Sequence, residues 1–452
     1  MAVEFFSNPS GVPNVPNGWN VAAIENLCSR VTSGATPLRS NAEYYDAGTI
    51  PWIRTQELKD GIIRESAQKI TPAALKETSA KLFPVDTVLM AMYGDGKTIT
   101  SLGILGIEAA TNQACCAMIT DPTRCLPRFL FYNLRHHRDD IIHIATGGAQ
   151  RNLSGAIIRR FAISVPPLDE QAVITGILGT LDDKIEQNRK MNETLEAMAR
   201  ALFKSWFVDF DPVRAKAEGR DPGLPAHIDA LFPGSFEDSE LGEVPTDWKI
   251  ISLGDFAEVI DCLHSRKPER VEEGLPLLQL GNIQADALLD MTDTYLITSE
   301  DYTKWISRME ASPGNCVVTN VGRVGAVAQI PSDFKAALGR NMTGIRCRTA
   351  YPFPTYLIQA LTSSSMSEEI VRKTDSGTIL DSLNVRNIPR LRIIVPPIQI
   401  LALFEHQCRP IRARMEANLK ETSSLATLRD TLLPKLISGE LRVKEFPNRQ
   451  GE

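Results

Sequence analysis

The sequence predicts an α+β fold of two β-rich domains, each followed by one long helix, with a pseudo-twofold internal repeat. Three observations support this prediction. The chain carries a duplication with a period of about 230 residues, each copy contains short apolar runs broken by Gly, Pro and Asn, and each copy closes with a seven-residue apolar repeat. A chain of 452 residues has room for two domains that each bury a core.

The duplication consists of four matching segments that recur in the same order at a nearly constant offset. The pairs are NVPNGW (14–19) with EVPTDW (243–248), TIPWIRTQEL (49–58) with GLPLLQLGNI (274–283), TGGAQRNLSG (146–155) with SGTILDSLNV (376–385), and FAISVPPLDEQ (161–171) with LRIIVPPIQIL (391–401). One such match would be weak evidence, whereas four in one order predict a true repeat.

The repeat also predicts where the parts of the chain begin and end. We expect a first β-rich domain at 1–165, a first long helix and docking region at 166–210, a linker at 211–245, a second β-rich domain at 246–395, and a second long helix with a tail at 396–452. The helices themselves should cover about 169–207 and about 399–437, and Pro434 should kink or end the second one.

Heptad spacing in the two helices indicates how they pack. The main positions seven apart are Ile174, Leu181, Asn188, Leu195 and Leu202 in the first helix, and Phe404, Ile411, Asn418, Leu425 and Leu432 in the second. One alternative is that each helix packs on its own domain. We favour a single antiparallel coiled coil, in which Asn188 and Asn418 meet at the middle and fix the register.

Charge is unevenly distributed along the chain, whose formal net charge is −6. Residues 17–160 hold 16 Lys and Arg against 13 Asp and Glu, a balance of +3, while residues 161–245 hold 8 against 16, a balance of −8. The acidic middle segment therefore hides a mildly basic first domain. This distribution permits nucleic-acid binding by that domain without requiring it.

Several classes of protein are disfavoured by the composition. No apolar run approaches the roughly 18 residues of a membrane span, and the first residues lack the features of a signal peptide. The eight cysteines include no CxxC pair, and the six histidines show no metal-binding spacing. We therefore expect a cytoplasmic protein that binds no metal and no membrane.

The segment AMYGDGKTIT (91–100) loosely fits a phosphate-binding loop, because Ala91 precedes Gly96, Lys97 and Thr98 at the required spacing. A working loop of that type needs a helix after it. Here the β-prone segment SLGILGIEAA follows, which predicts a hairpin. The second copy, VVTNVGRVGAVAQI (317–330), keeps a cation between glycines but lacks the Lys-Thr pair. A nucleotide-binding enzyme thus remains only the minor alternative.

Four segments of the chain resemble the specificity subunit of type I restriction-modification systems. They are SVPPLDEQAVITGILGTLDDKIEQNRK (164–190), ALFKSWFVDFDPVRAK (201–216), LFPGSFEDSELGEVPTDW (231–248) and TLLPKLISGEL (431–441). The resemblance, with the duplicated layout, covers nearly the whole chain. It implies that each β-rich block is a target recognition domain for one half of a bipartite double-stranded DNA site, and that the helices space the two halves.

The same resemblance implies partners. Two modification subunits would methylate adenine with S-adenosylmethionine, and restriction or motor subunits would use ATP and Mg to translocate and cleave DNA. This chain itself would bind no cofactor and have no catalytic residues. The sequence agrees, because it contains no dinucleotide fingerprint, no methyltransferase Asn-Pro-Pro-aromatic motif and no hydrolase or metalloprotease signature. A coiled-coil adaptor without DNA sequence preference is the other alternative.

Residues that could contact DNA follow from the repeat and from side-chain type. Lys97 and Arg323 would lie on equivalent hairpin tips, although either could be an ordinary exposed turn cation. The remaining candidates are Gln150, Arg151 and Asn152 in the first TGGAQRNLSG loop, Thr378 and Asn384 in its second copy, and Arg54, Asn112, Gln113, Arg340 and Asn341 placed by the repeat. Each loop residue could instead cap a turn.

Trp206, Phe207 and Phe210 form an aromatic cluster at the end of the first helix. They could pack inside the chain against the second helix. They could also form a docking surface for a modification subunit, because aromatic residues dominate the energetics of interfaces. These two interpretations remain open at the level of the sequence.

Overall fold

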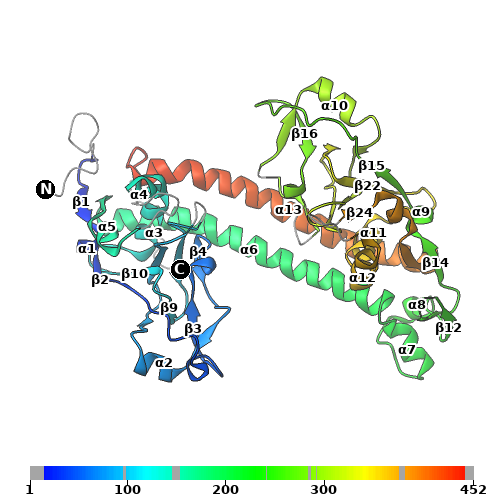
Figure 1. Cartoon of the computed structure of the whole chain (residues 1–452), viewed down its shortest axis with the longest axis horizontal. Helices are drawn as coiled ribbons and strands as arrows, with labels where there is room; N and C mark the ends of the chain where they lie inside the picture. The colour runs from blue at the N-terminus through cyan, green and yellow to red at the C-terminus, as the bar shows by residue number, and fades with distance from the viewer. Residues whose placement is uncertain are drawn as a thin grey trace, which may run out of the picture. The chain divides into compact units, whose positions relative to one another are not determined.

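The structure, a computed structural model, describes residues 15–94, 98–144, 153–240, 242–283, 287–291, 293–375 and 382–442. The chain divides into two compact units, one formed by residues 1–186 and 424–452 and the other by residues 187–423. Two 40-residue helices, α6 (Leu168–Phe207) and α13 (Ile398–Ile437), each contribute one part to both units (Figure 1).

The first head, residues 15–165, is built from a five-stranded sheet, a four-stranded sheet and a two-stranded ribbon. The strand order of the five-stranded sheet is β2 (Cys28–Ser33), β10 (Cys115–Thr120), β7 (Val88–Ala91), β8 (Leu102–Leu105) and β4 (Gly61–Ile63). The order of the four-stranded sheet is β5 (Lys69–Ile70), β3 (Ile50–Ile53), β9 (Ala109–Thr111) and β6 (Leu82–Phe83). The ribbon pairs β1 (Asn20–Ala23) with β11 (Ala162–Val165). The helices are α1 (Ile24–Leu27), α2 (Pro72–Glu77), α3 (Pro127–His136), α4 (Arg138–Ile144) and α5 (Gly155–Arg160), with 3-10 turns at Ala42–Tyr44 and Thr55–Glu57.

The second head, residues 246–395, contains two four-stranded sheets and two ribbons. The strand order of the first sheet is β15 (Ala257–Asp261), β22 (Met342–Cys347), β19 (Cys316–Thr319) and β20 (Val327–Gln329). The order of the second sheet is β17 (Tyr295–Ile297), β16 (Leu275–Leu278), β21 (Ala336–Leu338) and β18 (Glu310–Ala311). The ribbons pair β14 (Lys249–Ser252) with β25 (Arg392–Val395), and β23 (Thr374–Asp375) with β24 (Ser382–Leu383). The helices are α9 (Leu253–Phe256), α10 (Ser299–Trp305), α11 (Pro354–Leu361) and α12 (Ser364–Lys373), with 3-10 turns at Leu280–Asn282 and Val385–Arg390.

Over the described residues the two heads share the order of four strands in each of their two main sheets, while β4 of the first head and the β23–β24 ribbon of the second have no counterpart. The order β2-β10-β7-β8 matches β15-β22-β19-β20, and β5-β3-β9-β6 matches β17-β16-β21-β18. The sheet β5-β3-β9-β6 of the first head and the sheet β17-β16-β21-β18 of the second each have one parallel strand pair at the centre, β3 with β9 and β16 with β21. The internal repeat and the α+β class predicted from the sequence are therefore confirmed.

Each head closes on an antiparallel ribbon of its first and last strands, β1 with β11 and β14 with β25. A proline pair follows the last strand in both copies, and α6 or α13 begins at the next residue. A residue that precedes proline is biased away from helical conformation, which explains why neither helix starts earlier. The helix bounds agree with the expected 169–207 and 399–437 to within one residue, and Pro434 lies in the last turn of α13.

The helices pack in antiparallel directions within each unit. In the second unit, Asn192 Nδ2 donates to the carbonyl oxygen of Met415 at 3.1 Å. In the first unit, the Asp182 carboxylate accepts hydrogen bonds from Arg429 Nη1 and from Tyr132 Oη, both at 2.7 Å. The two long helices therefore pack on each other, and α6 also packs on the first head, because Tyr132 belongs to α3 of that head.

The segment 211–245, expected to be a linker, is folded. It forms α7 (Asp211–Ala217), α8 (Ala226–Asp229) and the antiparallel hairpin β12 (Phe236–Ser239) with β13 (Gly242–Pro245). Val213 is fully buried and Phe232 is 2% exposed, so apolar side chains fix this segment on the second unit. In the part of the chain that the structure describes, no helix is both long and apolar enough to cross a bilayer.

Candidate nucleic-acid interface

The parallel strand pair of each head ends at a group of polar and basic residues. In the first head, Ile53 of β3 lies opposite Thr111 of β9, so the next residues, Arg54 and Asn112, follow neighbouring strand ends. The amide of Asn112 donates to the carbonyl of Ile53 at 3.0 Å and continues the pairing by one residue. We call Thr36, Arg54, Lys81, Asn112 and Gln113 the first strand-end cluster.

The segments around this cluster are held together by specific contacts. The Cβ of any side chain at Gly34 would lie 2.0 Å from the Thr111 carbonyl oxygen, so only glycine lets the end of β2 cross over β9. The Thr36 hydroxyl then donates to the side-chain oxygen of Gln113. Lys81, immediately before β6, sends its Nζ to Thr32 Oγ1 at 2.8 Å. These contacts bring four separate segments to one edge of the sheet.

The second head repeats this edge. Leu278 of β16 lies opposite Leu338 of β21, and Gln279 and Arg340 come just after these strand ends. A Cβ at Gly339 would lie 2.1 Å from the Leu278 carbonyl oxygen, which again requires glycine at the crossing. We call His264, Gln279, Arg308, Arg340 and Asn341 the second strand-end cluster.

Two backbone hydrogen bonds attach the hairpin and the following loop to this edge in the first head. The Met92 amide, at the end of β7, donates to the carbonyl of Ala114 at 2.8 Å. The Leu153 amide donates to the Met92 carbonyl at 2.9 Å. Both candidate reading loops of the first head are therefore anchored beside the strand-end cluster.

The second head has the same pair of bonds. The Asn320 amide donates to the Asn341 carbonyl at 2.8 Å, and the Leu383 amide donates to the Asn320 carbonyl at 2.8 Å. Because Leu383 aligns with Leu153 in the repeat, one scaffold carries the two sets of loops. The scaffold is shared while the side chains that it presents differ.

The described candidates of the first head are only partly satisfied. Arg54 Nε and Asn112 Oδ1 are both buried and have no hydrogen-bond partner among the described residues. The Arg54 amide donates to Glu57 Oε2 at 3.4 Å, so Glu57 holds the turn while the guanidinium remains available. Gln113 is exposed.

The described candidates of the second head differ in exposure, in backbone conformation and in the hydrogen bonds that they make. Arg340 is exposed, and Asn341 adopts a left-handed backbone conformation with φ of 65°. Arg323 is exposed, but its Nη1 donates to the Ile283 carbonyl at 2.8 Å. Asn384 caps a 3-10 turn through its side-chain oxygen, which accepts the Arg386 amide at 3.0 Å. Asn384 is thus the capping residue that the sequence left as an alternative.

Five of the expected DNA contacts lie outside the described residues: Lys97, Gln150, Arg151, Asn152 and Thr378. Their anchoring positions are described, and the strands before and after the segment pair as the predicted hairpin requires. β7 and β8 pair antiparallel, with Met90 opposite Leu102. Among residues 98–105 a turn leads directly into a strand, so no helix follows to bind phosphates and the phosphate-loop alternative fails.

The aromatic cluster at the end of α6 is part of the core. Trp206, Phe207 and Phe210 are 3%, 3% and 5% exposed. Phe207 packs edge-to-face on Phe404 of α13 at 5.1 Å between ring centroids, and Trp206 packs on Phe232 at 5.3 Å. The burial and these ring contacts favour the interpretation that the three residues pack inside the chain over the interpretation that they form a docking surface.

The expected asparagines of the coiled coil come together, but not as a symmetric pair. Asn188 Nδ2 lies 3.5 Å from the Asn418 carbonyl oxygen and donates to Glu421 Oε2 at 2.9 Å. Asn418 Nδ2 instead donates to Asn192 Oδ1 at 2.8 Å. The neighbouring heptad positions Leu181, Leu195, Ile411 and Leu425 are half-buried, whereas Asn188 and Asn418 are 0% and 1% exposed.

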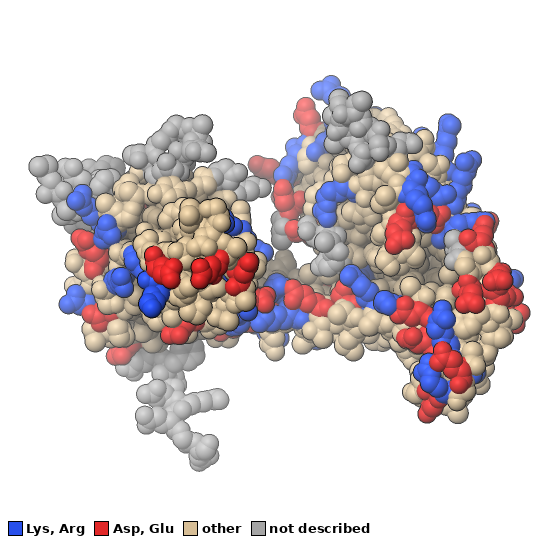
Figure 2. Space-filling model, turned by 60° about the horizontal axis from the view of Figure 1, so that its bottom comes forward, with Lys and Arg blue, Asp and Glu red and all other residues tan. Residues whose placement is uncertain are grey.

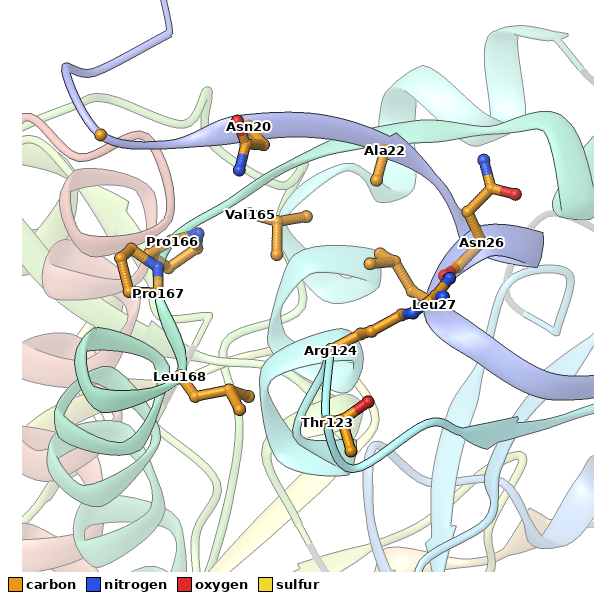
Figure 3. A pocket seen from close by; sticks show the side chains of 11 residues that line it. Asn20, Ala22, Asn26, Leu27, Thr123, Arg124, Val165, Pro166, Pro167 and Leu168 are labelled. Atoms are coloured by element: carbon orange, nitrogen blue, oxygen red, sulfur yellow. The ribbon is translucent and has the colours of Figure 1, made fainter.

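Two surface hollows are formed by described residues, one in each unit. One of about 490 Å³ lies in the first unit, between the β1–β11 ribbon and the start of α6 (Figure 3). Its labelled walls include the proline pair and one cation, Arg124, whose Nη1 donates to the Asn26 carbonyl at 2.9 Å. Another of about 510 Å³ in the second unit has Phe203 and Tyr356 in its lining.

One group of described residues has the chemistry of metal ligands. The ligand atoms of Asp261, Cys262 and His264 lie within 4.8 Å of one another. However, His264 Nε2 and Arg308 Nη1 already lie 2.7 Å and 3.5 Å from Asp261 Oδ2. Burial also raises the pKa of the Cys262 thiol and disfavours the thiolate that binds metals. Ion pairing accounts for this group without a metal.

Basic and acidic side chains are interspersed on each unit on the face seen in Figure 2. No broad basic field is therefore seen on this face among the described residues. The features that mark the candidate interface are the strand-end clusters. Sequence reasoning missed Thr36, Lys81, His264 and Arg308 in these clusters, because each joins the edge from a segment that has no recognisable match in the repeat.

Comparisons with known proteins agree with this architecture. Residues 16–197 match the model of the type I restriction modification DNA specificity domain. The chain is 26% identical to the MjaIX specificity subunit of Methanocaldococcus jannaschii, over 96% of both chains. It is 25% identical to the HindI specificity subunit of Haemophilus influenzae, over 72% of this chain and 80% of that one.

A solved structure shares the fold. The S subunit of a type I restriction-modification system from M. genitalium superposes with a TM-score of 0.59 at 16% identity, covering 94% of this chain and 97% of that chain. The duplicated heads and the two long helices thus occur in a chain that is similar along nearly its whole length to type I restriction-modification specificity subunits, and its first part matches the model of their DNA specificity domain.

Proposed function

We propose that this chain binds double-stranded DNA at a two-part target, with each head reading one part, and that it directs adenine methylation and restriction by partner subunits. One observation carries the proposal. Two heads have the same backbone frame, closed by the same pair of hydrogen bonds, yet they present different side chains at their strand ends. Such a pair suits two unrelated DNA half-sites better than one symmetric ligand.

The side chains at the strand ends suit base recognition. Arginine pairs with the O6 and N7 acceptors of guanine, and asparagine or glutamine pairs with the N6 and N7 groups of adenine. The first cluster offers Arg54, Asn112 and Gln113, and the second offers Gln279, Arg340 and Asn341. We infer that Arg54 and Arg340 read bases, with help from the loops at 145–152 and 376–381.

The chemistry would belong to partners. Two modification subunits would supply the methyl transfer from S-adenosylmethionine, and restriction or motor subunits would supply the steps that need ATP and Mg. Because the aromatic cluster is buried, we expect these partners to bind exposed faces of α6 and α13. In this proposal the chain contributes target selection and spacing and takes no part in catalysis.

The test is a genome-wide map of methylated adenines in cells that express this chain with its modification partner, compared with cells that lack the chain. The expected result is a new motif of two short specific blocks around a fixed unspecified spacer. If the complex assembles and no chain-dependent motif appears, the chain would be a coiled-coil adaptor without sequence preference.

A further inference from the structure

Lys81 and Arg308 occupy closely related places in the two heads. Lys81 immediately precedes β6, which pairs antiparallel with β9 through Leu82 and Ala110. Arg308 lies two residues before β18, which pairs antiparallel with β21 through Glu310 and Ala337. Both cations therefore lie beside the carboxyl end of the parallel strand pair, one residue apart in register.

Both cations also make the same type of contact. Lys81 Nζ donates to the Ser33 carbonyl at 3.2 Å, at the end of β2. Arg308 Nη1 donates to the Cys262 carbonyl at 3.0 Å, just after the corresponding strand β15. Each side chain thus bridges the first strand of its head to the strand-end cluster, and its charge is held at that edge.

The two copies in one chain separate shared features from divergent ones. Under the proposed function, the two half-sites differ in base sequence but have the same sugar-phosphate backbone. A feature that both heads keep at one edge is therefore suited to the backbone, while the divergent side chains are suited to bases. The cation at the start of β6 and of β18 belongs to the shared class.

We propose that Lys81 and Arg308 bind DNA phosphates, one in each half of the target, and so set the position of each head on the duplex. This inference rests on the proposed function and adds a sequence-independent contact that the repeat motifs did not reveal. Phosphate contacts fix register and orientation without carrying sequence information, which leaves Arg54 and Arg340 to read bases.

Both side chains keep donors for a phosphate. Lys81 Nζ has two acceptors among the described residues, so one of its three N–H groups is available. The Arg308 side chain is 47% exposed, and only its Nη1 makes a described hydrogen bond. Asp261 is the acidic group facing Arg308, and its Oδ2 also lies 2.7 Å from His264 Nε2.

The experiment measures DNA binding by the complete complex of this chain with its modification partner, on a duplex that carries the mapped target, from low to high salt. The variants are Lys81→Met, Arg308→Met and the double variant. Matched controls are Arg124→Met and Arg348→Met, because these residues follow β10 and β22, at the ends opposite to the clusters. Each control arginine also donates to one backbone carbonyl, at 2.9 Å.

The slope of log K against log salt should become shallower by about 1 in each single variant and by about 2 in the double variant. The controls should keep the wild-type slope, and the methylated motif should stay unchanged in all variants. Thermal melting separates this result from a structural role. An unchanged slope, whether or not the melting temperature falls, would overturn the proposal, as would a relaxed base preference in one block. Absence of specific binding by the wild-type complex would instead refute the proposed function.

Discussion

At the scale of single residues, burial decides which aromatic and charged groups can act on a partner. Phe207 is in contact with Phe203, Phe404, Tyr356 and Trp248, so it belongs to the core of the second unit. A solvated aromatic at that position would have been a docking candidate. Its role is instead to stabilise the junction of α6, α13 and the second head.

Phe207→Ala should therefore destabilise the protein by about 3–5 kcal/mol, because it removes a fully packed ring and leaves a cavity. Chemical denaturation of the chain measures this loss. Met198→Ala is the control, since Met198 is 53% exposed and its truncation should change the free energy of unfolding by less than about 0.5 kcal/mol. Equal effects of the two substitutions would contradict the packing.

A buried ion pair links the two helices beside the asparagines. Arg412 Nη1 lies 3.8 Å from Glu196 Oε2, with side chains that are 4% and 8% exposed. Arg412 Nη2 also donates to the Ala287 carbonyl at 3.4 Å. Several donors and acceptors of this pair lack a close hydrogen-bond partner among the described residues, so the charges depend on each other.

Arg412→Met should destabilise the protein by up to about 3–5 kcal/mol, because it removes the buried counter-charge of Glu196 and leaves that carboxylate with only the exposed Arg200, 3.3 Å away. The double variant Arg412→Met with Glu196→Gln should recover much of that loss, since no uncompensated charge remains. Denaturant titration of the three proteins forms the comparison. A double variant as unstable as Arg412→Met alone would show that the ion pair is not the source of the effect.

At the scale of elements, the paired helices combine apolar ends with a polar middle. The buried groups at the middle are Asn188, Asn192, Glu196, Arg412 and Asn418, whereas Leu178 and Phe404 are fully buried nearer the starts of α6 and α13. Buried polar groups permit fewer alternative registers than an all-leucine seam would, because a shift would leave them unpaired. The helices are therefore suited to keep one defined alignment.

Removing one heptad from each helix, residues 185–191 from α6 and 417–423 from α13, tests the spacing role. At about 1.5 Å per residue the pair shortens by about 10 Å, which corresponds to about 3 base pairs of duplex. The methylated motif should keep both specific blocks with a shorter spacer. An original spacer in an assembled complex would contradict a ruler function for the helices.

At the scale of the whole molecule, two heads on one frame imply two independent readings. Arg54 and Arg340 come from different heads, and each lies at the end of a parallel strand pair. Because base readings in separate heads share no contacts, changes in one head should leave the other unaffected.

Arg54→Ala should relax one position in one block of the motif, and Arg340→Ala should relax one position in the other block. Each should cost about 1–3 kcal/mol of discrimination if the arginine binds a guanine in bidentate fashion. Methylation maps of the two variants provide the measurement. Relaxation of both blocks by a single substitution would mean that the heads are not independent.

The sequence determined the repeat, the two long helices and the hairpin character of residues 91–100. These features follow from local signals, namely periodicity, proline pairs and glycine placement, and each signal acts within a few residues. The proline pair in the segment FAISVPPLDEQ was enough to place the start of α6 to within one residue.

Only the tertiary structure decided which side chains face each other. Lys81 reaches the end of β2, 48 residues away, and Phe207 meets Phe404 from the other helix. Asn418 pairs with Asn192, although heptad spacing paired it with Asn188. Such contacts depend on strand register and on how close two backbones approach, as at Gly34 and Thr111. A linear pattern of residue types does not specify these quantities, because they arise from packing between segments that are distant in the chain.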